Sequence, residues 1–364
     1  MAVPPTTENG VCRIAGHTQD VAPPFRVSVL DQSPVSAGMS GSEALANTLD
    51  LARLADALGY HRYWAAEHHG GPMLAGPSPE VLIGPIAAAT SAIRVGSGGV
   101  MLPHYSPLKV AESFSVLAGL FPARIDLGLG RASGTDVMTT YALQRDRRQA
   151  APDDFRDQLD ELLAWLEDGF GADHPLNRVV ATLPGRPETP EPWLLGSSSQ
   201  SAIWAAHRGL PYAFADFINL AGADIAAHYR ARFAVAAGRL RAPRTAVAVW
   251  ALAADTHEEA ERLASSSRMA MHKLRRGELI PVPPVEEAVA WLEAQGVGRS
   301  GRRMVLGTPG EVRAGLERLA ADYGAEEVIV VTITHAHEAR RRSYELIAEA
   351  VGLEARAVAA VVGA

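Results

Sequence analysis

The sequence predicts an α/β protein, a TIM (β/α)8 barrel with insertions at the C-terminal face of its strands. From about residue 25 onward, short β-type runs alternate with longer helical patterns, as a parallel α/β sheet requires. Eight such runs occur in 364 residues, and closing them into a barrel removes both exposed sheet edges. With 48% apolar and 21% charged residues, the chain is able to bury a large core. A doubly wound open sheet remains the alternative.

The expected strands and helices follow each other in regular alternation along the chain. The strands are expected at residues 25–30, 61–66, 93–100, 124–129, 193–196, 210–215, 246–252 and 328–333. The helices are expected at residues 43–58, 79–91, 107–120, 153–168, 199–208, 223–238, 257–274, 309–323 and 338–351. Helix starts carry the clearest local signals. Thr308 and Thr256 are each followed three residues later by a glutamate, as at a helix N-terminus.

The domain organisation is expected to be simple, with a flexible extension over residues 1–24 and one barrel domain over residues 25–364. Excess length falls at 131–152, 170–192 and 273–303. The last of these contains several prolines and glycines, and we expect it to run over the barrel mouth.

The charge balance excludes several classes of partner. Subtracting 41 acidic from 34 basic residues leaves a net charge of −7, without the basic excess of a nucleic-acid-binding protein. Cys12 is the single cysteine, so no intrachain disulfide or cysteine-based metal cage is expected. The N-terminal residues do not resemble a secretory signal, and no apolar run reaches the roughly 18 residues of a membrane span. These features predict a cytoplasmic protein without a membrane partner.

The polar cluster Glu67-His68-His69 directly follows the second expected strand, at the end of a barrel where active sites lie. Three consecutive side chains cannot all face one side of a strand, so no metal site is expected. His68 is the candidate acid or base, because histidine titrates near neutral pH and Glu67 could fix its tautomer. The alternative is that one histidine packs and the other is solvated. Asp31, His69 and His104 follow strands at the same end and are candidate substrate contacts.

A serine-rich turn between the fifth expected strand and the next helix is a candidate anion site. Ser197, Ser198 and Ser201 lie where free backbone N–H groups and the helix dipole favour a phosphate. Serine is also favoured there as a simple helix cap, so the turn alone does not decide. Arg131 follows the neighbouring fourth strand, and its guanidinium suits a phosphate monoester.

Gly98 and Gly99 lie inside the third expected strand, where a glycine pair marks a bulge or the close approach of a ligand. Neither a dinucleotide-binding fingerprint nor a P-loop occurs, so nicotinamide cofactors and ATP lack their usual binding motifs.

Four segments together resemble the luciferase-like flavin-dependent monooxygenase family, in particular a subgroup that includes polyketide-tailoring oxygenases. They are residues 64–69 (WAAEHH), 94–103 (RVGSGGVMLP), 124–131 (RIDLGLGR) and the serine-rich turn before Trp204. The resemblance extends from about residue 25 to the C-terminus. Light-emitting relatives carry Cys before the arginine and Glu in the phosphate turn, where this chain has Gly130 and Ser197. Light emission is therefore not expected.

The resemblance implies a TIM barrel that binds FMN at its mouth. By position, Arg131, Ser197, Ser198 and Ser201 would hold the phosphate, and Gly98-Gly99 would form a non-prolyl cis peptide under the flavin ring. His68 corresponds to the active-site histidine of the family, and Glu67 would order it.

The implied activity is that of a two-component monooxygenase, in which a separate flavin reductase supplies reduced FMN. With O2 the enzyme would hydroxylate or epoxidise a small organic substrate, for example an aromatic polyketide in antibiotic biosynthesis. The resemblance also implies a homodimer formed through the helices after strands 2 and 3, where residues 86–90 are rich in alanine. The alternatives are an F420-dependent oxidoreductase of the same superfamily and a flavin-binding barrel without turnover.

Overall fold

The computed structural model describes residues 25–131, 136–149, 153–180, 183–236, 239–297 and 304–356. Eight parallel strands close into a barrel in the order β1-β2-β3-β4-β5-β6-β7-β9, and β9 pairs back to β1. The strands of the closed barrel are β1 Arg26–Asp31, β2 Arg62–Ala65, β3 Arg94–Met101, β4 Ile125–Gly130, β5 Glu191–Gly196, β6 Tyr212–Ala215, β7 Thr245–Ala253 and β9 Glu327–Val331. The predicted TIM barrel is therefore confirmed, and the open sheet is wrong.

A ninth strand, β8 Met304–Gly307, was not expected from the sequence. It pairs with the C-terminal half of β7, whose nine residues extend beyond β6 and β9. With only four residues, two of them half-buried, β8 lacks the long apolar run that identifies a strand in a sequence.

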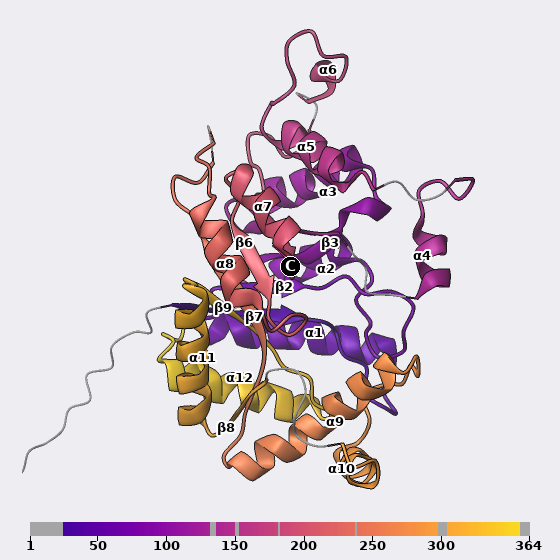
Figure 1. Cartoon of the computed structure of the whole chain (residues 1–364), viewed down its shortest axis with the longest axis vertical. Helices are drawn as coiled ribbons and strands as arrows, with labels where there is room; N and C mark the ends of the chain where they lie inside the picture. Colours follow the sequence, from indigo (N-terminus) through magenta and orange to yellow (C-terminus); the bar gives the residue numbers. More distant parts are fainter. Residues whose placement is uncertain are drawn as a thin grey trace, which may run out of the picture.

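The nine expected helices are all present around the barrel (Figure 1). They are α1 Gly41–Ala57, α2 Pro79–Ala88, α3 Pro107–Leu120, α5 Phe155–Leu166, α7 Ser199–His207, α8 Gly222–Ala231, α9 His257–Arg275, α11 Pro309–Tyr323 and α12 His337–Val351. The caps of α9 and α11 form as expected, because Thr256 accepts from the Glu259 N–H and Thr308 makes a capping box with Glu311. The predicted C-terminus of α8 was wrong, since the chain turns after Ala231 and the Ala234 N–H donates to Ala206 O.

The insertions contain three further helices, α4 Val137–Leu143, α6 Asn177–Val180 and α10 Val285–Ala294. Of these, α10 packs against α9, whereas α4 buries none of its residues and stands at the edge of the molecule (Figure 1). A short 3-10 turn, Leu102–His104, follows β3. No helix in the described part of the chain is long and apolar enough to span a bilayer.

The core of the barrel is a packed interior made of three tryptophans and small residues. Trp64, Trp193 and Trp250 fill it, and the first two meet edge to face with ring centroids 5.4 Å apart. The alanines of β6 and β7 leave the room that these rings need. A second and larger apolar layer lies between the strands and the surrounding helices. Ligands therefore have access to the mouth of the barrel and not to its interior.

A buried ionic network crosses the barrel at the start of β2. The fully buried Arg62 guanidinium donates to Asp126 Oδ2 and to Glu327 Oε1, each at 2.6 Å. The Trp64 indole N–H also donates to Asp126 Oδ2, at 3.0 Å, and Trp193 lies under the guanidinium, 4.6 Å from its ring centroid. Because each charge has close partners of opposite sign, the network ties β2, β4 and β9 together.

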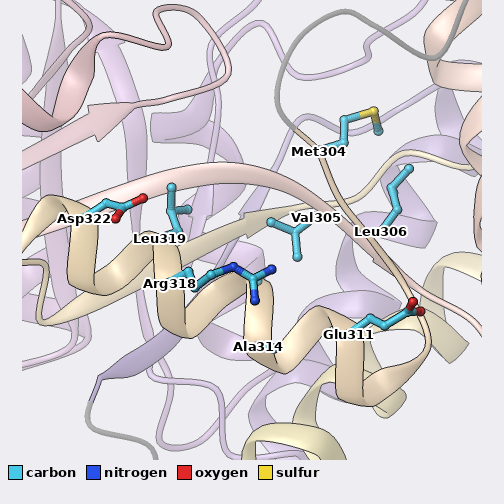
Figure 2. A pocket seen from close by; sticks show the side chains of 9 residues that line it. Met304, Val305, Leu306, Glu311, Ala314, Arg318, Leu319 and Asp322 are labelled. Carbon is cyan, nitrogen blue, oxygen red and sulfur yellow. The ribbon is translucent and has the colours of Figure 1, made fainter.

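A hollow of about 550 Å³ lies on the outside of the barrel between β8 and α11 (Figure 2). Gly315 lets α11 approach β8, since a Cβ at this position would lie 2.4 Å from Val305 Cγ1. Arg318, Glu311 and Asp322 line its helix side. None of the described residues that line this hollow is a predicted site residue.

Candidate active site

A cavity of about 370 Å³ opens at the mouth of the barrel beside β2. Three segments line it, namely the chain after β2, the N-terminal cap of α4 and the chain from the end of α9 onward. The lining residues are His68, His69, Gly70, Gly71, Pro72, Met73, Leu74, Asp136, Ala270, Leu274, Gly277, Glu278, Leu279 and Ile280. The segment expected to run over the mouth therefore does so at its beginning, over residues 274–280, before it turns into α10.

His68 lies against this cavity in a largely buried setting. Its backbone N–H donates to Gly76 O at 3.1 Å, and its ring Nδ1 has no hydrogen-bond partner among the described residues. Burial, with a smaller contribution from His69, lowers the pKa of His68 to about 4. The imidazole is consequently neutral at physiological pH, and it is able to accept a proton or a hydrogen bond from a ligand in the cavity.

Glu67 does not order His68, so this part of the expectation was wrong. Its carboxylate accepts from His69 Nε2 at 2.8 Å, from the Tyr105 hydroxyl at 3.0 Å and from the Met101 N–H at 2.9 Å. The reason is the alternation of side chains along an extended segment, which places residues i and i+2 on one side and residue i+1 on the other. This alternation could have been applied to the sequence, where it places the side chains of Glu67 and His69 on the same side of the chain.

His69 and His104 occupy different positions in the site. His69 lines the cavity and is held by Glu67, whereas His104 is not among the described lining residues and contacts the His69 ring edge to face, with ring centroids 6.2 Å apart. Burial lowers the pKa of His104, and its Nε2 has no partner among the described residues. Of the two candidate substrate contacts, the cavity therefore reaches only His69.

Asp31, the third candidate substrate contact, is a structural residue. It is fully buried and accepts from Arg340 at 2.6 Å, from the Ser33 N–H at 2.7 Å and from the Tyr63 hydroxyl. Although burial alone raises the pKa of Asp31, the Arg340 guanidinium and the Tyr63 hydroxyl hold it below its ordinary value. The carboxylate thus serves a buried ion pair with α12 and does not reach the cavity, and its assignment to substrate was wrong.

The Gly98-Gly99 peptide bond is cis, as the resemblance implied, and it lies at an irregularity in the pairing of β3 with β4. A Cβ at Gly98 would lie 2.5 Å from Leu30 Cδ1, and one at Gly99 would lie 2.7 Å from Gly128 O. At Gly99 the contact is with the backbone of β4, so this position requires glycine. The two glycines thus allow β3 to pack closely against β4 and Leu30.

The serine turn and Arg131 come together because β4 and β5 are neighbours in the barrel. Ser198 caps α7 and accepts from the Ser201 N–H, and the Ser201 hydroxyl donates to Ser198 O at 2.9 Å. Arg131 is exposed, with its guanidinium 5.8 Å from the ring centroid of Trp204. Ser198 is therefore a helix cap, and the exposed Arg131 lies beside the N-terminus of α7.

Two further residues support this turn and were not among the predicted site residues. The Tyr212 hydroxyl lies 3.0 Å from Ser201 Oγ, and the Asn219 side chain donates to Ser197 O at 2.9 Å. Asn219 follows β6, so its place after a barrel strand was the signal that could have identified it. Tyr212 lies within a strand and gave no such signal.

The sequence model of the family described as luciferase-like monooxygenase matches residues 25–327. This chain belongs to that family. An Escherichia coli (strain K12) protein named luciferase-like monooxygenase is 42% identical over 324 residues, covering 88% of this chain and 95% of the relative. The N-acetyl-S-alkylcysteine monooxygenase of Bacillus subtilis (strain 168) is 37% identical over 336 residues, covering 90% and 98%.

Solved structures share the fold of this family member. Apo-MsnO8 superimposes with a TM-score of 0.83 at 40% identity, covering 91% of this chain and 99% of that one. Two more distant structures, both below 25% identity, show the fold alone. One is a type II Baeyer-Villiger monooxygenase in complex with FMN, with a TM-score of 0.67, 19% identity and coverage of 90% and 97%. The other is an F420-dependent secondary alcohol dehydrogenase, with a TM-score of 0.60, 14% identity and coverage of 90% and 99%.

Proposed function

We propose that this protein is an FMN-dependent monooxygenase, which receives reduced FMN from a separate reductase and oxidises a small organic substrate with O2. One oxygen atom would enter the substrate and the other would leave as water, with the two electrons supplied by the reduced flavin. The observation that carries the proposal is the arrangement of three features at the same end of the barrel. They are the serine turn at the start of α7, the Gly98-Gly99 pair of β3, and the cavity lined by the neutral His68.

The residues present fit FMN. Arg131 would neutralise the phosphate, while the N-terminus of α7 with Ser197, Ser198 and Ser201 would offer it hydrogen bonds. Gly98 and Gly99 would lie under the flavin ring, as the resemblance implies, since neither carries a side chain that could obstruct a ligand. The Baeyer-Villiger monooxygenase of the same fold is in complex with FMN, which supports the same cofactor.

His68 would handle protons at the substrate side of the site. Its unprotonated ring would accept a proton from a group that becomes acidic during the reaction. Because a pKa of about 4 makes the protonated ring a strong acid, it would return that proton readily, so the ring would serve as base and acid in turn. Glu67 and His69 would hold the loop after β2 in place. Glu67 accepts hydrogen bonds from His69 in this loop and from the Met101 N–H at the end of β3, and so connects the two segments. The segment over residues 274–280 would help to exclude water.

An F420-dependent oxidoreductase is the alternative, because a structural neighbour of the same fold is an F420-dependent dehydrogenase. Anaerobic titration of the protein with reduced FMN and with reduced F420, followed by mixing of each complex with O2, separates the two. Because free reduced FMN itself consumes O2, the readout is the rate of flavin reoxidation compared with that of free reduced FMN. The proposal predicts that FMN binds and that the bound flavin reoxidises at a different rate from free reduced FMN. Tight binding of F420 with no binding of FMN would overturn it, and FMN binding without an oxygenated product from any substrate would indicate a barrel without turnover.

Replacement of Arg131 with alanine is expected to weaken the binding of reduced FMN by roughly 10- to 150-fold. Loss of one charge-assisted hydrogen bond to the phosphate costs about 1.5 to 3 kcal/mol. Fluorescence titration under anaerobic conditions measures the effect. Arg318→Ala is a matched control, because this arginine lies in the outer hollow of Figure 2. Equal affinity in wild type and Arg131→Ala would refute the phosphate assignment.

A homodimer through α2 and α3 is also part of this proposal. Three large apolar side chains are exposed on these helices, Val81 and Leu120 at 66% each and Val116 at 43%, and pairing them across a two-fold axis would bury them. Light scattering at micromolar protein is expected to give the dimer mass, and Leu120→Glu to give the monomer mass. A monomeric wild type, or a Val235→Glu control that dissociates equally, would contradict this interface.

A further inference from the structure

The cavity beside His68 is lined by other residues than those assigned to FMN. None of Gly98, Gly99, Arg131 and the three serines is among its described lining residues. Its volume of about 370 Å³ is at the small end of the range for small-molecule pockets, roughly 300–1,000 Å³. The cavity therefore offers room for a second ligand, with His68 on its wall.

Much of this wall is apolar, and two of its leucines are exposed. Aliphatic and thioether side chains form it, namely Met73, Leu74, Ala270, Leu274, Leu279 and Ile280. Leu274 is 41% exposed and Leu279 is 47% exposed, although leucines are commonly buried. The rim continues onto α4, where Val137 and Met138 next to the cavity-lining Asp136 are exposed as well. A group of exposed apolar side chains around a cavity is typical of a ligand-binding surface.

The charges around the cavity disfavour an anionic ligand. Asp136 and Glu278 are the carboxylates of its lining, and no lysine or arginine is among the described lining residues. His68 brings no positive charge at neutral pH, since burial and His69 lower its pKa to about 4. An anion in this cavity would lose its hydration beside two carboxylates, and the cations nearest to it, Lys273 and Arg276, are already paired with Glu278.

A cationic ligand finds little compensation either, because both carboxylates already have partners. Asp136 caps α4, accepting from the Met138 and Thr139 N–H groups at 2.9 and 3.0 Å. Glu278 accepts from Lys273 at 3.1 Å and lies 3.5 Å from Arg276. An ammonium group that entered would compete with these contacts and lose water against aliphatic walls.

We propose that the cavity is the substrate site and selects an uncharged, mainly aliphatic molecule, with Leu279 as a specificity-determining residue. Its role as a substrate site rests on the proposed monooxygenase function. The selection by charge does not, because it follows from the lining alone and is measurable on the protein without flavin.

The test is a calorimetric titration of the flavin-free protein with three eight-carbon probes, 1-octanol, octanoate and octylammonium, at pH 7.5. We expect 1-octanol to bind at least about tenfold more tightly than either ion. Leu279→Arg places a cation at the exposed rim and is expected to raise the affinity for octanoate relative to 1-octanol by about tenfold or more. Val235→Arg adds the same charge at an exposed apolar residue outside the cavity and should leave the order unchanged.

Tighter binding of octanoate or octylammonium than of 1-octanol by the wild type would overturn the proposal. So would a Leu279→Arg variant with the same preference as the Val235→Arg control. If the probes behave as expected but reduced FMN does not bind, the proposed function fails while the neutral ligand site stands. If reduced FMN binds and the complex reacts with O2, but 1-octanol does not bind more tightly than the two ions, the selection by charge is wrong and the proposed function stands.

Discussion

Replacement of His68 with alanine is expected to lower turnover by about 10²- to 10⁴-fold while leaving the affinity for reduced FMN nearly unchanged. The loss is the usual size of a proton-transfer contribution. Ground-state binding is expected to be spared because His68 lines a cavity whose described lining contains none of the residues assigned to FMN. Once a substrate is known, the variant should release peroxide in place of oxidised product. Steady-state kinetics together with an anaerobic FMN titration separate the two effects.

The controls for His68 come from the same mouth. His69→Ala removes a ring that lines the cavity but is held by Glu67. His104→Ala removes a ring that contacts His69 and is not among the described lining residues. Both are expected to retain more activity than His68→Ala. An equal loss in all three variants would indicate general disruption of the mouth and would contradict a specific role for His68, as would a His68→Ala enzyme of wild-type turnover.

The low pKa of His68 predicts that the stability of the folded protein depends on pH. It lies at about 4 in the folded protein against 6.5 for an ordinary histidine, so the unfolded chain takes up the proton first. The stability that comes from keeping this ring neutral is therefore complete above about pH 6.5 and is lost as the pH falls toward 4. Urea unfolding at several pH values should show a smaller loss over this window in His68→Ala than in the wild type.

Replacement of Arg62 with methionine is expected to destabilise the fold by about 3 to 5 kcal/mol. Its guanidinium is fully buried and donates to both Asp126 and Glu327, so removing it leaves two carboxylates with reduced compensation inside the barrel. Urea unfolding monitored by circular dichroism measures the change in the free energy of unfolding.

The matched control for Arg62 is Arg262→Met on α9. Arg262 also pairs with two carboxylates, Glu259 and Glu286, but its side chain is 46% exposed. Exposed ion pairs contribute about 0 to 1 kcal/mol, so this variant should remain close to wild type. An effect of Arg62→Met no larger than that of Arg262→Met would show that the buried network does not stabilise the barrel.

The barrel itself could be predicted because its signals are local. Each expected strand is a short apolar run between turn residues, and α3 and α11 have the predicted bounds because proline and capping residues mark their starts. The proximity of Arg131 to the serine turn also followed from chain order, since consecutive parallel strands of a barrel are neighbours.

One error at the site came from a signal that was present in the sequence but only partly used. The alternation of side chains after β2 shows that Glu67, His68 and His69 cannot all lie on one side, and it also pairs Glu67 with His69.

The strand β8 was missed because its four residues are too few to distinguish from a loop. They form a strand because the long β7 offers backbone groups for pairing beyond β6 and β9.

The sequence by itself determined the order of strands and helices, the end of the barrel at which the candidate site lies, and the residue types at the serine turn and the glycine pair. Only the tertiary structure decided which charged groups form ion pairs within the fold. Asp31 pairs with Arg340 and Arg62 pairs with Glu327, residues separated by most of the chain. Such pairs form when barrel closure brings β1 and β2 against β9 and α12, and no local pattern encodes that contact. Closure also shaped the cavity, because its walls come from the segments after β2 and α9, which meet only at the closed mouth.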